Sequence, residues 1–366
     1  VAATTHADLA YLDAARDPEG RGDAKLTLKE MMQRYGVPGV SVAIIRDFEV
    51  AEAQGFGVSG ADSGEAVTSH TRFQVASISK PIAALAVLRA AQEGKLDLEA
   101  DINTLLTSWK LPENEFTSKI KVTPAMLLSH TGGTTVHGFP GYTTFETIPT
   151  VVQVLNGDGN TIPVVVDQAP GSVWRYSGGG TTIMQLALQD VMGTPFPEIA
   201  LKTVFEPIGM ADSCYCQPPP PEVAALASRG HNRDGESIEG GWHVYPELSA
   251  AGLWTTPTDL CKAAIDVQCA LRGDVGRVLK PETARQMLAD REVGEYGLGF
   301  GLSRHGADKT IYFQHGGSNE GFRCELIAHM SGGYGAAIMT NGDVGTRIVN
   351  ELISRIAAHD NWEGRW

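Results

Sequence analysis

Ser77 and Lys80, a serine and a lysine three residues apart, are the pair whose residue types and spacing most directly indicate chemistry. A helical pattern of apolar residues begins directly after Ser77, so the serine is expected at the opening of a buried helix. Three residues are close to one helical turn, which lets the lysine amine reach the serine hydroxyl. A serine becomes a nucleophile when a neighbouring base removes its proton. The pair therefore predicts acyl transfer through Ser77, with N–H groups of the helix opening available to an oxyanion.

A second pair at the same spacing, Ser118 and Lys121, shows how little the spacing proves alone. It lies in a polar stretch and no apolar helix begins at its serine, so a solvated segment is expected there. An ordinary interpretation also exists for Ser77 and Lys80, as a capping serine and a lysine whose stem covers apolar surface. The rest of the chain must decide between a nucleophile and chance.

Tyr176 is a third candidate, because it stands just before the glycines 178–180. A Gly-rich turn lets backbone approach a substrate closely, and the phenol could carry a proton between serine and leaving group. The ordinary alternative is a packed aromatic ring whose hydroxyl is hydrogen-bonded.

The run His315, Gly316, Gly317 and Ser318 lies between two strand-like segments. Its two glycines would let a ligand lie against a sheet edge, and the Ser318 N–H could point at a substrate carbonyl. A hairpin turn or β-bulge is the ordinary alternative.

The apolar pattern predicts one antiparallel sheet built from both ends of the chain, with a helical lobe inserted in the middle. Two strands are expected at 40–45 and 49–57, and three near the end, where residues 296–302 also alternate large side chains with glycine. The expected organisation is one catalytic domain, 1–366. Its α/β lobe would be formed by 1–94 with 251–366, and its helical lobe by 95–250.

Composition and charge exclude several classes of function. The 366 residues are 42% hydrophobic and carry a net charge of -14, which argues for a globular chain and against a nucleic-acid partner. No apolar run is long enough for a membrane span. The pattern Gly55-x-Gly57-x-x-Gly60 matches a dinucleotide fingerprint by letter, but no helical pattern follows it.

The five cysteines do not form a recognisable framework. Cys214 and Cys216 are one residue apart, an awkward spacing for a bridge or a metal, and all five are expected to be plain core or surface residues. His130 and His137 lack a third ligand at suitable spacing, so they are expected to be structural rather than metal ligands.

Taken together, the three constellations resemble the penicillin-recognising serine hydrolase superfamily. That superfamily contains class C β-lactamases, D-alanyl-D-alanine carboxypeptidases, D-aminopeptidases and family VIII esterases. The first motif is S-x-x-K at Ser77, the second begins at Tyr176, and the third begins at His315, in the family's order. Shorter similarities lie at residues 128–133, 206–210, 252–260 and 316–322.

This resemblance implies an α/β β-lactamase/transpeptidase-like fold with a cleft between its two lobes. Ser77 would form the acyl-enzyme, Lys80 and Tyr176 would share the proton transfers, and the backbone N–H groups of Ser77 and Ser318 would hold the oxyanion. The substrate-binding residues expected with them are His315, Gly316, Gly317, Tyr142 and Trp254. The resemblance implies no metal or cofactor, and a small-molecule ester, amide or peptide as substrate.

Two departures from the family pattern bear on the substrate. The second motif ends in Gly178 where asparagine is common, so the amide that would contact an acylamino group is missing. The third begins with His315 where class C β-lactamases have lysine, which removes a fixed positive charge. Both favour a carboxylesterase-like or D-peptidase-like enzyme over a β-lactamase or D-alanyl-D-alanine carboxypeptidase. A non-catalytic peptide or lactam sensor is the alternative from another class.

The compartment and the oligomeric state stay open at this level. The first residue is valine rather than methionine, which indicates a trimmed or processed chain. Secretion, the bacterial periplasm and the cytoplasm are all compatible with the sequence.

Overall fold

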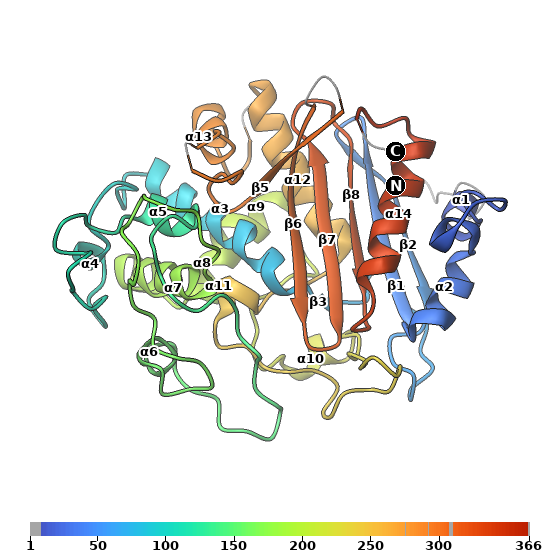
Figure 1. Ribbon diagram of the computed structural model, residues 1–366, viewed down its shortest axis with the longest axis horizontal. Coiled ribbons are helices and arrows are strands. Elements are labelled where there is room, and N and C mark those ends of the chain that lie inside the picture. Colours follow the sequence, from blue (N-terminus) through green and yellow to red (C-terminus); the bar gives the residue numbers. More distant parts are fainter. Residues whose placement is uncertain (1–8, 275, 292, 307–309, 365–366) are drawn as a thin grey trace.

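An antiparallel sheet of six strands forms the centre of the molecule (Figure 1). The computed structural model describes residues 9–274, 276–291, 293–306 and 310–364. The strand order is β2-β1-β8-β7-β6-β5, so strands from both ends of the chain lie side by side. The expected sheet is confirmed. Its strands are β1 (Gly39–Arg46), β2 (Glu49–Gly57), β5 (Gly301–His305), β6 (Thr310–Asn319), β7 (Phe322–His329) and β8 (Gly335–Thr340).

The C-terminal part contributes four strands where the sequence predicted three. Residues 296–300 form a tight turn, in which the Tyr296 hydroxyl donates to the Gly299 carbonyl at 2.8 Å, so β5 begins only at Gly301. The His315 run is neither a turn nor a bulge, because it is the second half of β6 and pairs residue by residue with β7. The glycines at 55 and 57 lie in β2 and are followed by turns, without the helix that a dinucleotide site requires.

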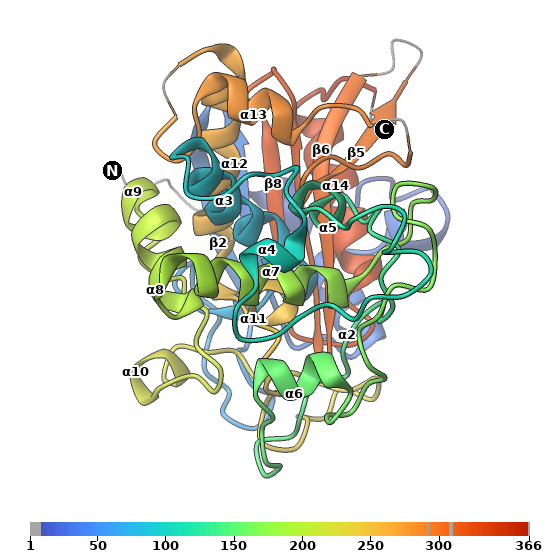
Figure 2. The same ribbon diagram turned by 90° about the vertical axis from the view of Figure 1, so that its left-hand side faces the viewer.

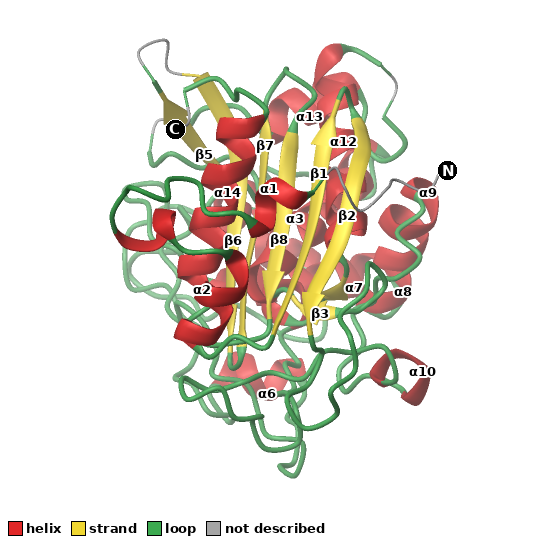
Figure 3. Cartoon of the chain, turned by 90° about the vertical axis from the view of Figure 1, so that its right-hand side faces the viewer, coloured by secondary structure: helices red, strands yellow, loops and turns green. Residues whose placement is uncertain are grey.

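Both faces of the sheet are buried, which explains why β1 and β8 read as continuous apolar runs. In β1, Val40, Val42 and Ile44 pack into one hydrophobic cluster, while Ala43 and Ile45 pack into a second cluster on the other face. Figure 3 shows the first of these faces, covered by α14 (Thr346–His359), α2 (Leu28–Tyr35) and α1 (Ala10–Asp13).

Arg355 of α14 forms hydrogen bonds that hold the N-terminal segment on this face of the sheet. Its buried guanidinium donates at 2.6 Å to the carbonyl oxygens of Leu12, in α1, and Leu26, shortly before α2. Charge-assisted hydrogen bonds of this kind are among the stronger ones in a protein interior. The N-terminal segment is therefore part of the α/β layer.

The opposite face carries the long helices α12 (Pro257–Arg272) and α3 (Ser79–Gln92), followed by the inserted helices (Figure 2). α7 (Gly178–Met192) crosses the centre of this helical region and contacts α3 and α11. The shorter helices are α4 (Ile102–Leu105), α5 (Pro124–Leu128), α6 (Val151–Asn156), α8 (Phe196–Ala200), α9 (Glu206–Ile208), α10 (Pro221–Ala224), α11 (Leu248–Ala251) and α13 (Pro281–Met287).

A small second sheet joins the two regions. β3 (Phe73–Gln74) pairs with β4 (Trp254–Thr255). Next to it, Cys214 pairs with Trp254 in an isolated bridge and forms a disulfide with Cys216, so the expectation that all five cysteines are unpaired was wrong. The Cα atoms of the two cysteines lie 5.3 Å apart, which allows the bridge despite their awkward spacing. No helix in the described residues is long and apolar enough to cross a bilayer.

Candidate active site

Ser77 lies in a single 3-10 turn, Ala76–Ile78, that leads directly into α3. The preceding residue, Ala76, has a φ of 49°, an uncommon conformation for a residue with a side chain. Strand β6 presses against this turn, because a Cβ added at Gly317 would lie 2.1 Å from the carbonyl oxygen of Val75. Only glycine fits at that point, and the close approach places β6 next to the serine.

Lys80 lies in the first turn of α3 and is almost fully buried. Its Nζ donates to Ser77 Oγ at 2.9 Å and to the Ala250 carbonyl oxygen at 2.8 Å. Burial lowers the pKa of Lys80 to about 7, because an ammonium ion is poorly solvated there. A large fraction of the lysine is therefore neutral near pH 7 and able to accept a proton.

Tyr176 lies in the loop before α7. The next residue, Ser177, is the N-cap of that helix. Its ring centroid is 4.9 Å from Lys80 Nζ. Burial raises the pKa of Tyr176, and a hydrogen bond with the Ser77 side chain acts in the opposite direction. The structure thus brings together the three residues that the sequence singled out, from a helix opening and a distant loop.

The three groups meet at a cavity of about 660 Å³. Ser77 and Tyr176 line it directly, whereas Lys80 lies behind the serine and is not exposed in it. The other lining residues are His137, Trp174, Arg175, His315, Gly316, Gly317, Ser318, Arg323, Cys324, Glu325 and Thr346. The whole His315–Ser318 run of β6 therefore faces the cavity, as the motif predicted.

His315 is neutral in this setting. Burial, and then the nearby Lys80, lower its pKa to about 3. Its Nδ1 lies 2.7 Å from the Gly316 carbonyl oxygen, so Nδ1 carries the proton and Nε2 has a free lone pair. Within the described part of the chain, Nε2 has no hydrogen-bond partner. The side chain at this position is therefore not a cation.

The absence of asparagine at position 178 also has a structural reason. A Cβ at Gly178 would lie 3.0 Å from the Phe139 ring and 3.2 Å from the His137 carbonyl oxygen. The Gly178 N–H donates to that same carbonyl at 3.0 Å, so the long loop is tied to the start of α7. The loop occupies the space that a longer side chain would need.

Two expected substrate contacts are not brought to the cavity. Trp254 is completely buried in β4, edge-on to Trp242 and Phe322, so the expectation that it contacts substrate was wrong. Tyr142 is also buried, and its hydroxyl accepts from the N–H of Asn160 at 3.0 Å. Both aromatic rings support the loops and strands around the site.

Sequence reasoning missed several residues of the site. Trp174 is 41% exposed at the cavity wall, two residues before Tyr176, and its place next to the second motif was the only available signal. Arg323 and Thr346 reach the cavity from β7 and from the start of α14, positions that only the folded sheet brings near Ser77. No motif or residue pattern around Arg323 or Thr346 in the sequence indicates that they belong to the site.

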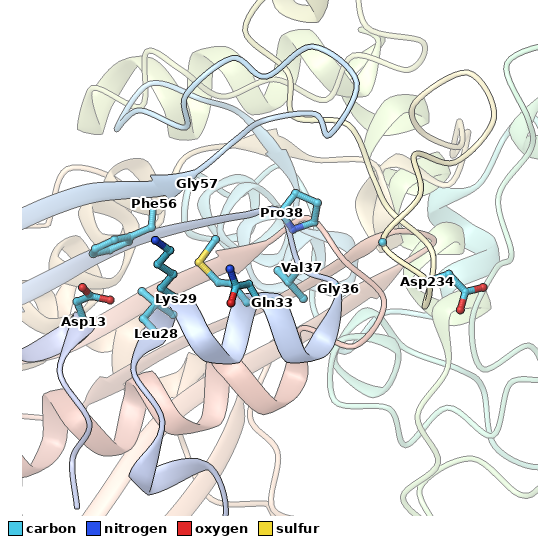
Figure 4. A pocket seen from close by; sticks show the side chains of 12 residues that line it. Asp13, Leu28, Lys29, Gln33, Gly36, Val37, Pro38, Phe56, Gly57 and Asp234 are labelled. Atoms are coloured by element: carbon cyan, nitrogen blue, oxygen red, sulfur yellow. The ribbon is translucent and has the colours of Figure 1, made fainter. Parts of the chain in front are cut away.

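A second cavity, of about 640 Å³, lies between α2 and the end of β2 (Figure 4). Its floor is apolar, with Leu28, Val37 and Phe56, and Lys29 and Asp13 stand at one end. Its lining residues include no serine, tyrosine or histidine. The groups needed for acyl transfer are therefore gathered only at the first of these two cavities.

Comparison with known proteins agrees with the motifs and the geometry. A family model described as Beta-lactamase matches residues 25–360. The chain belongs to the Beta-lactamase family. The resemblance found in the sequence is thus confirmed at the level of the family.

Two curated proteins match this chain at low sequence identity. The chain is 21% identical to Protein flp of Staphylococcus aureus (strain N315), over 90% of this chain and 65% of that protein. It is 28% identical to Esterase EstB of Burkholderia gladioli, over 60% of this chain and 58% of that esterase. The chain thus spans less than two thirds of the length of Protein flp.

A solved structure supports the fold. D-amino acid amidase from Ochrobactrum anthropi SV3, complexed with L-phenylalanine, superposes with a TM-score of 0.72 at 18% identity. The superposition covers 91% of this chain and 97% of that one. The Beta-lactamase fold is therefore shared over nearly the whole chain.

Proposed function

We propose that this chain is a serine hydrolase that forms an acyl-enzyme on Ser77 and hydrolyses esters or amides. The observation that carries the proposal is the 2.9 Å hydrogen bond between Lys80 Nζ and Ser77 Oγ at the wall of a cavity. The lowered pKa of Lys80 supports it, because a base works best when its pKa is near the operating pH.

In the proposed acylation step, neutral Lys80 takes the proton of Ser77 while Oγ attacks the carbonyl carbon of the substrate. The carbonyl oxygen becomes an oxyanion, for which the backbone N–H groups of Ser77 and Ser318 are the proposed donors. Collapse of this intermediate breaks the bond to the alcohol or amine, which leaves with a proton passed through Tyr176. Water then attacks the acyl-enzyme with the same groups in reverse order and releases the acid.

At positions 315 and 178 the cavity wall lacks the cation and the side-chain amide that would favour a β-lactam-like substrate. Neutral His315 offers no charge to an anion, and Gly178 offers no amide to an acylamino group. The exposed Trp174 ring provides apolar surface for an alkyl or aromatic acyl group. These features support a carboxylesterase-like or D-peptidase-like activity.

The direct test replaces the nucleophile. Ser77→Ala should abolish turnover of short p-nitrophenyl esters and remove the covalent adduct that a fluorophosphonate forms. Ser118→Ala is the matched control, because it changes the serine of the other serine–lysine pair, which is exposed and far along the chain. Turnover or labelling that survives in Ser77→Ala would refute the proposal.

The alternatives separate in the same preparation. Nitrocefin turnover would indicate a β-lactamase, and D-alanine released from a D-alanyl-D-alanine peptide would indicate a carboxypeptidase. A non-catalytic sensor would bind such ligands without turnover of any ester, amide or lactam. A mass spectrum taken after an acylating inhibitor reads out whether Ser77 reacts at all.

A further inference from the structure

His130 follows the end of α5 and lies against Tyr176, a position that the proposed mechanism does not use. We propose that His130 is a positioning residue. By accepting hydrogen bonds from the backbone on both sides of Tyr176, it holds the Tyr176 phenol against Ser77. This inference rests on the function proposed above only for its consequence in catalysis. The arrangement itself is a matter of structure and can be tested without turnover.

The backbone at His130 is held in a conformation that usually selects glycine. α5 ends in a Schellman motif, in which Thr131 N–H donates to the Met126 carbonyl at 2.8 Å and His130 N–H donates to Leu127. This places His130 at the left-handed position, with a φ of 60°. Glycine adopts that conformation without steric cost, so a histidine there needs a reason that lies in its side chain.

The side chain and carbonyl of His130 both contact the tyrosine segment. The Arg175 N–H donates to the His130 carbonyl oxygen at 2.8 Å, and the Ser177 N–H donates to Nδ1 at 3.2 Å. These donors lie one residue before and one residue after Tyr176. The imidazole and phenol rings are in contact, with their planes inclined at 39° and their centroids 4.3 Å apart. Three contacts thus constrain the backbone and the ring of a single residue.

The acceptor role fixes the chemical form of the imidazole. Nδ1 accepts from Ser177, so Nε2 carries the proton in the neutral ring. Protonation of Nδ1 would place its N–H opposite the Ser177 N–H and would break this hydrogen bond. Burial keeps the pKa of His130 well below its usual value, with Lys80 and His315 acting in the same direction. The hydrogen bond from Ser177 to Nδ1 is therefore intact over the pH range in which Lys80 can act as a base.

A purely structural role would have a different signature. If His130 only closed the end of α5, glycine would do so at least as well, and Tyr176 would stay in place. A positioning role requires the acceptor atom, so glycine should fold and yet release the tyrosine. Asparagine should restore much of the effect, because its side-chain oxygen can accept from Ser177 and the residue tolerates the left-handed conformation.

The experiment compares His130→Gly and His130→Asn with the wild-type protein by crystallography and by fluorophosphonate labelling of Ser77. We expect His130→Gly to fold, to show the Tyr176 ring displaced from Ser77, and to label about 100-fold more slowly, the scale of loss for a misplaced group. His130→Asn should recover at least about tenfold of that rate. In ester turnover the loss should fall on kcat with KM little changed, because His130 does not line the cavity.

Asn361→Gly supplies the matched control. Asn361 has a φ of 52° at the end of α14, where Trp362 N–H donates to Ala357 in the same 6→1 pattern, far from the cavity. Asn361→Gly should show how stability changes when a left-handed residue is replaced by glycine. It should leave the labelling of Ser77 unchanged. Tyr176 unmoved in His130→Gly, or labelling within about threefold of wild type, would overturn the inference. If the wild-type protein itself is not labelled at Ser77, the proposed function fails, while the position of Tyr176 still decides this inference.

Discussion

The Nζ atom of Lys80 donates to the carbonyl oxygen of Ala250 at 2.8 Å, across 170 positions of the sequence. This bond joins the first turn of α3 to α11 and holds the amine in the direction of Ser77 Oγ. The proposed catalytic geometry therefore depends on a backbone group of the inserted region as well as on the three side chains.

The lowered pKa of Lys80 predicts the pH dependence of activity. The lysine must be neutral to accept the serine proton, so kcat/KM should rise with pH through an apparent pKa near 7 and then level off. Lys80→Arg should lose activity by about 10²–10⁴-fold at all pH values, because a guanidinium stays protonated. Lys121→Arg, in the exposed pair, should keep the wild-type profile. A rising limb near pH 10 would contradict this assignment.

Removal of the Tyr176 hydroxyl tests its role in proton transfer. Tyr176→Phe keeps the ring against His130 and should lower kcat by about 10²–10⁴-fold. Tyr142→Phe also deletes a buried hydroxyl and its hydrogen bond, but away from the cavity, so it should keep turnover. Stopped-flow measurement of p-nitrophenol release compares the two. Equal rates in both variants would exclude the phenol from the reaction.

The close approach of β6 to the serine turn predicts different effects of two neighbouring substitutions on stability. Gly317→Ala would place a Cβ 2.1 Å from the Val75 carbonyl oxygen and should lower the free energy of unfolding by about 1–3 kcal/mol. At Gly316 the added Cβ would meet the end of the flexible Glu325 side chain at 2.9 Å, which can move aside. Denaturant titration of both variants measures the difference, and an equal loss in both would contradict the packing argument.

Glu247, which precedes α11, predicts how stability changes with pH. It is fully buried, and in the described residues neither carboxylate oxygen has a hydrogen-bond partner. Burial raises its pKa from 4.5 to about 7. As pH rises between these values, the unfolded chain loses the proton while the folded chain keeps it, so ionisation favours unfolding.

Glu247→Gln removes that ionisation and should stabilise the protein at pH 8 by up to about 3 kcal/mol relative to wild type. The gain should vanish near pH 4, where the glutamate is protonated in both states. Thermal or denaturant unfolding at the two pH values measures it. A gain that is the same at both would show that the carboxyl charge is not the cause.

Local pattern predicted much of this structure because central strands of the sheet, such as β1 and β8, consist of strongly apolar runs. β1 and β2 lie within one residue of their predicted bounds. Ser77 and Lys80 could be found for the same reason, since one helical turn fixes their relation. The family motifs supplied Tyr176 and His315.

The remaining features depend on tertiary contacts that no local pattern carries. Trp254 occurs in a family-like stretch, and only the packing of β3 on β4 shows that it is buried. The disulfide between Cys214 and Cys216 lies where Cys214 pairs with β4, and the left-handed backbone of His130 depends on the end of α5. Arg323 and Thr346 join the site because distant segments converge at the cavity.

The loop that carries His137 and Phe139 limits which side chains fit at position 178. A Cβ added at Gly178 would lie 3.0 Å from the Phe139 ring and 3.2 Å from the His137 carbonyl oxygen, so asparagine there would require the loop to move. A longer side chain at position 178 would therefore also shift the loop that brings His137 to the cavity.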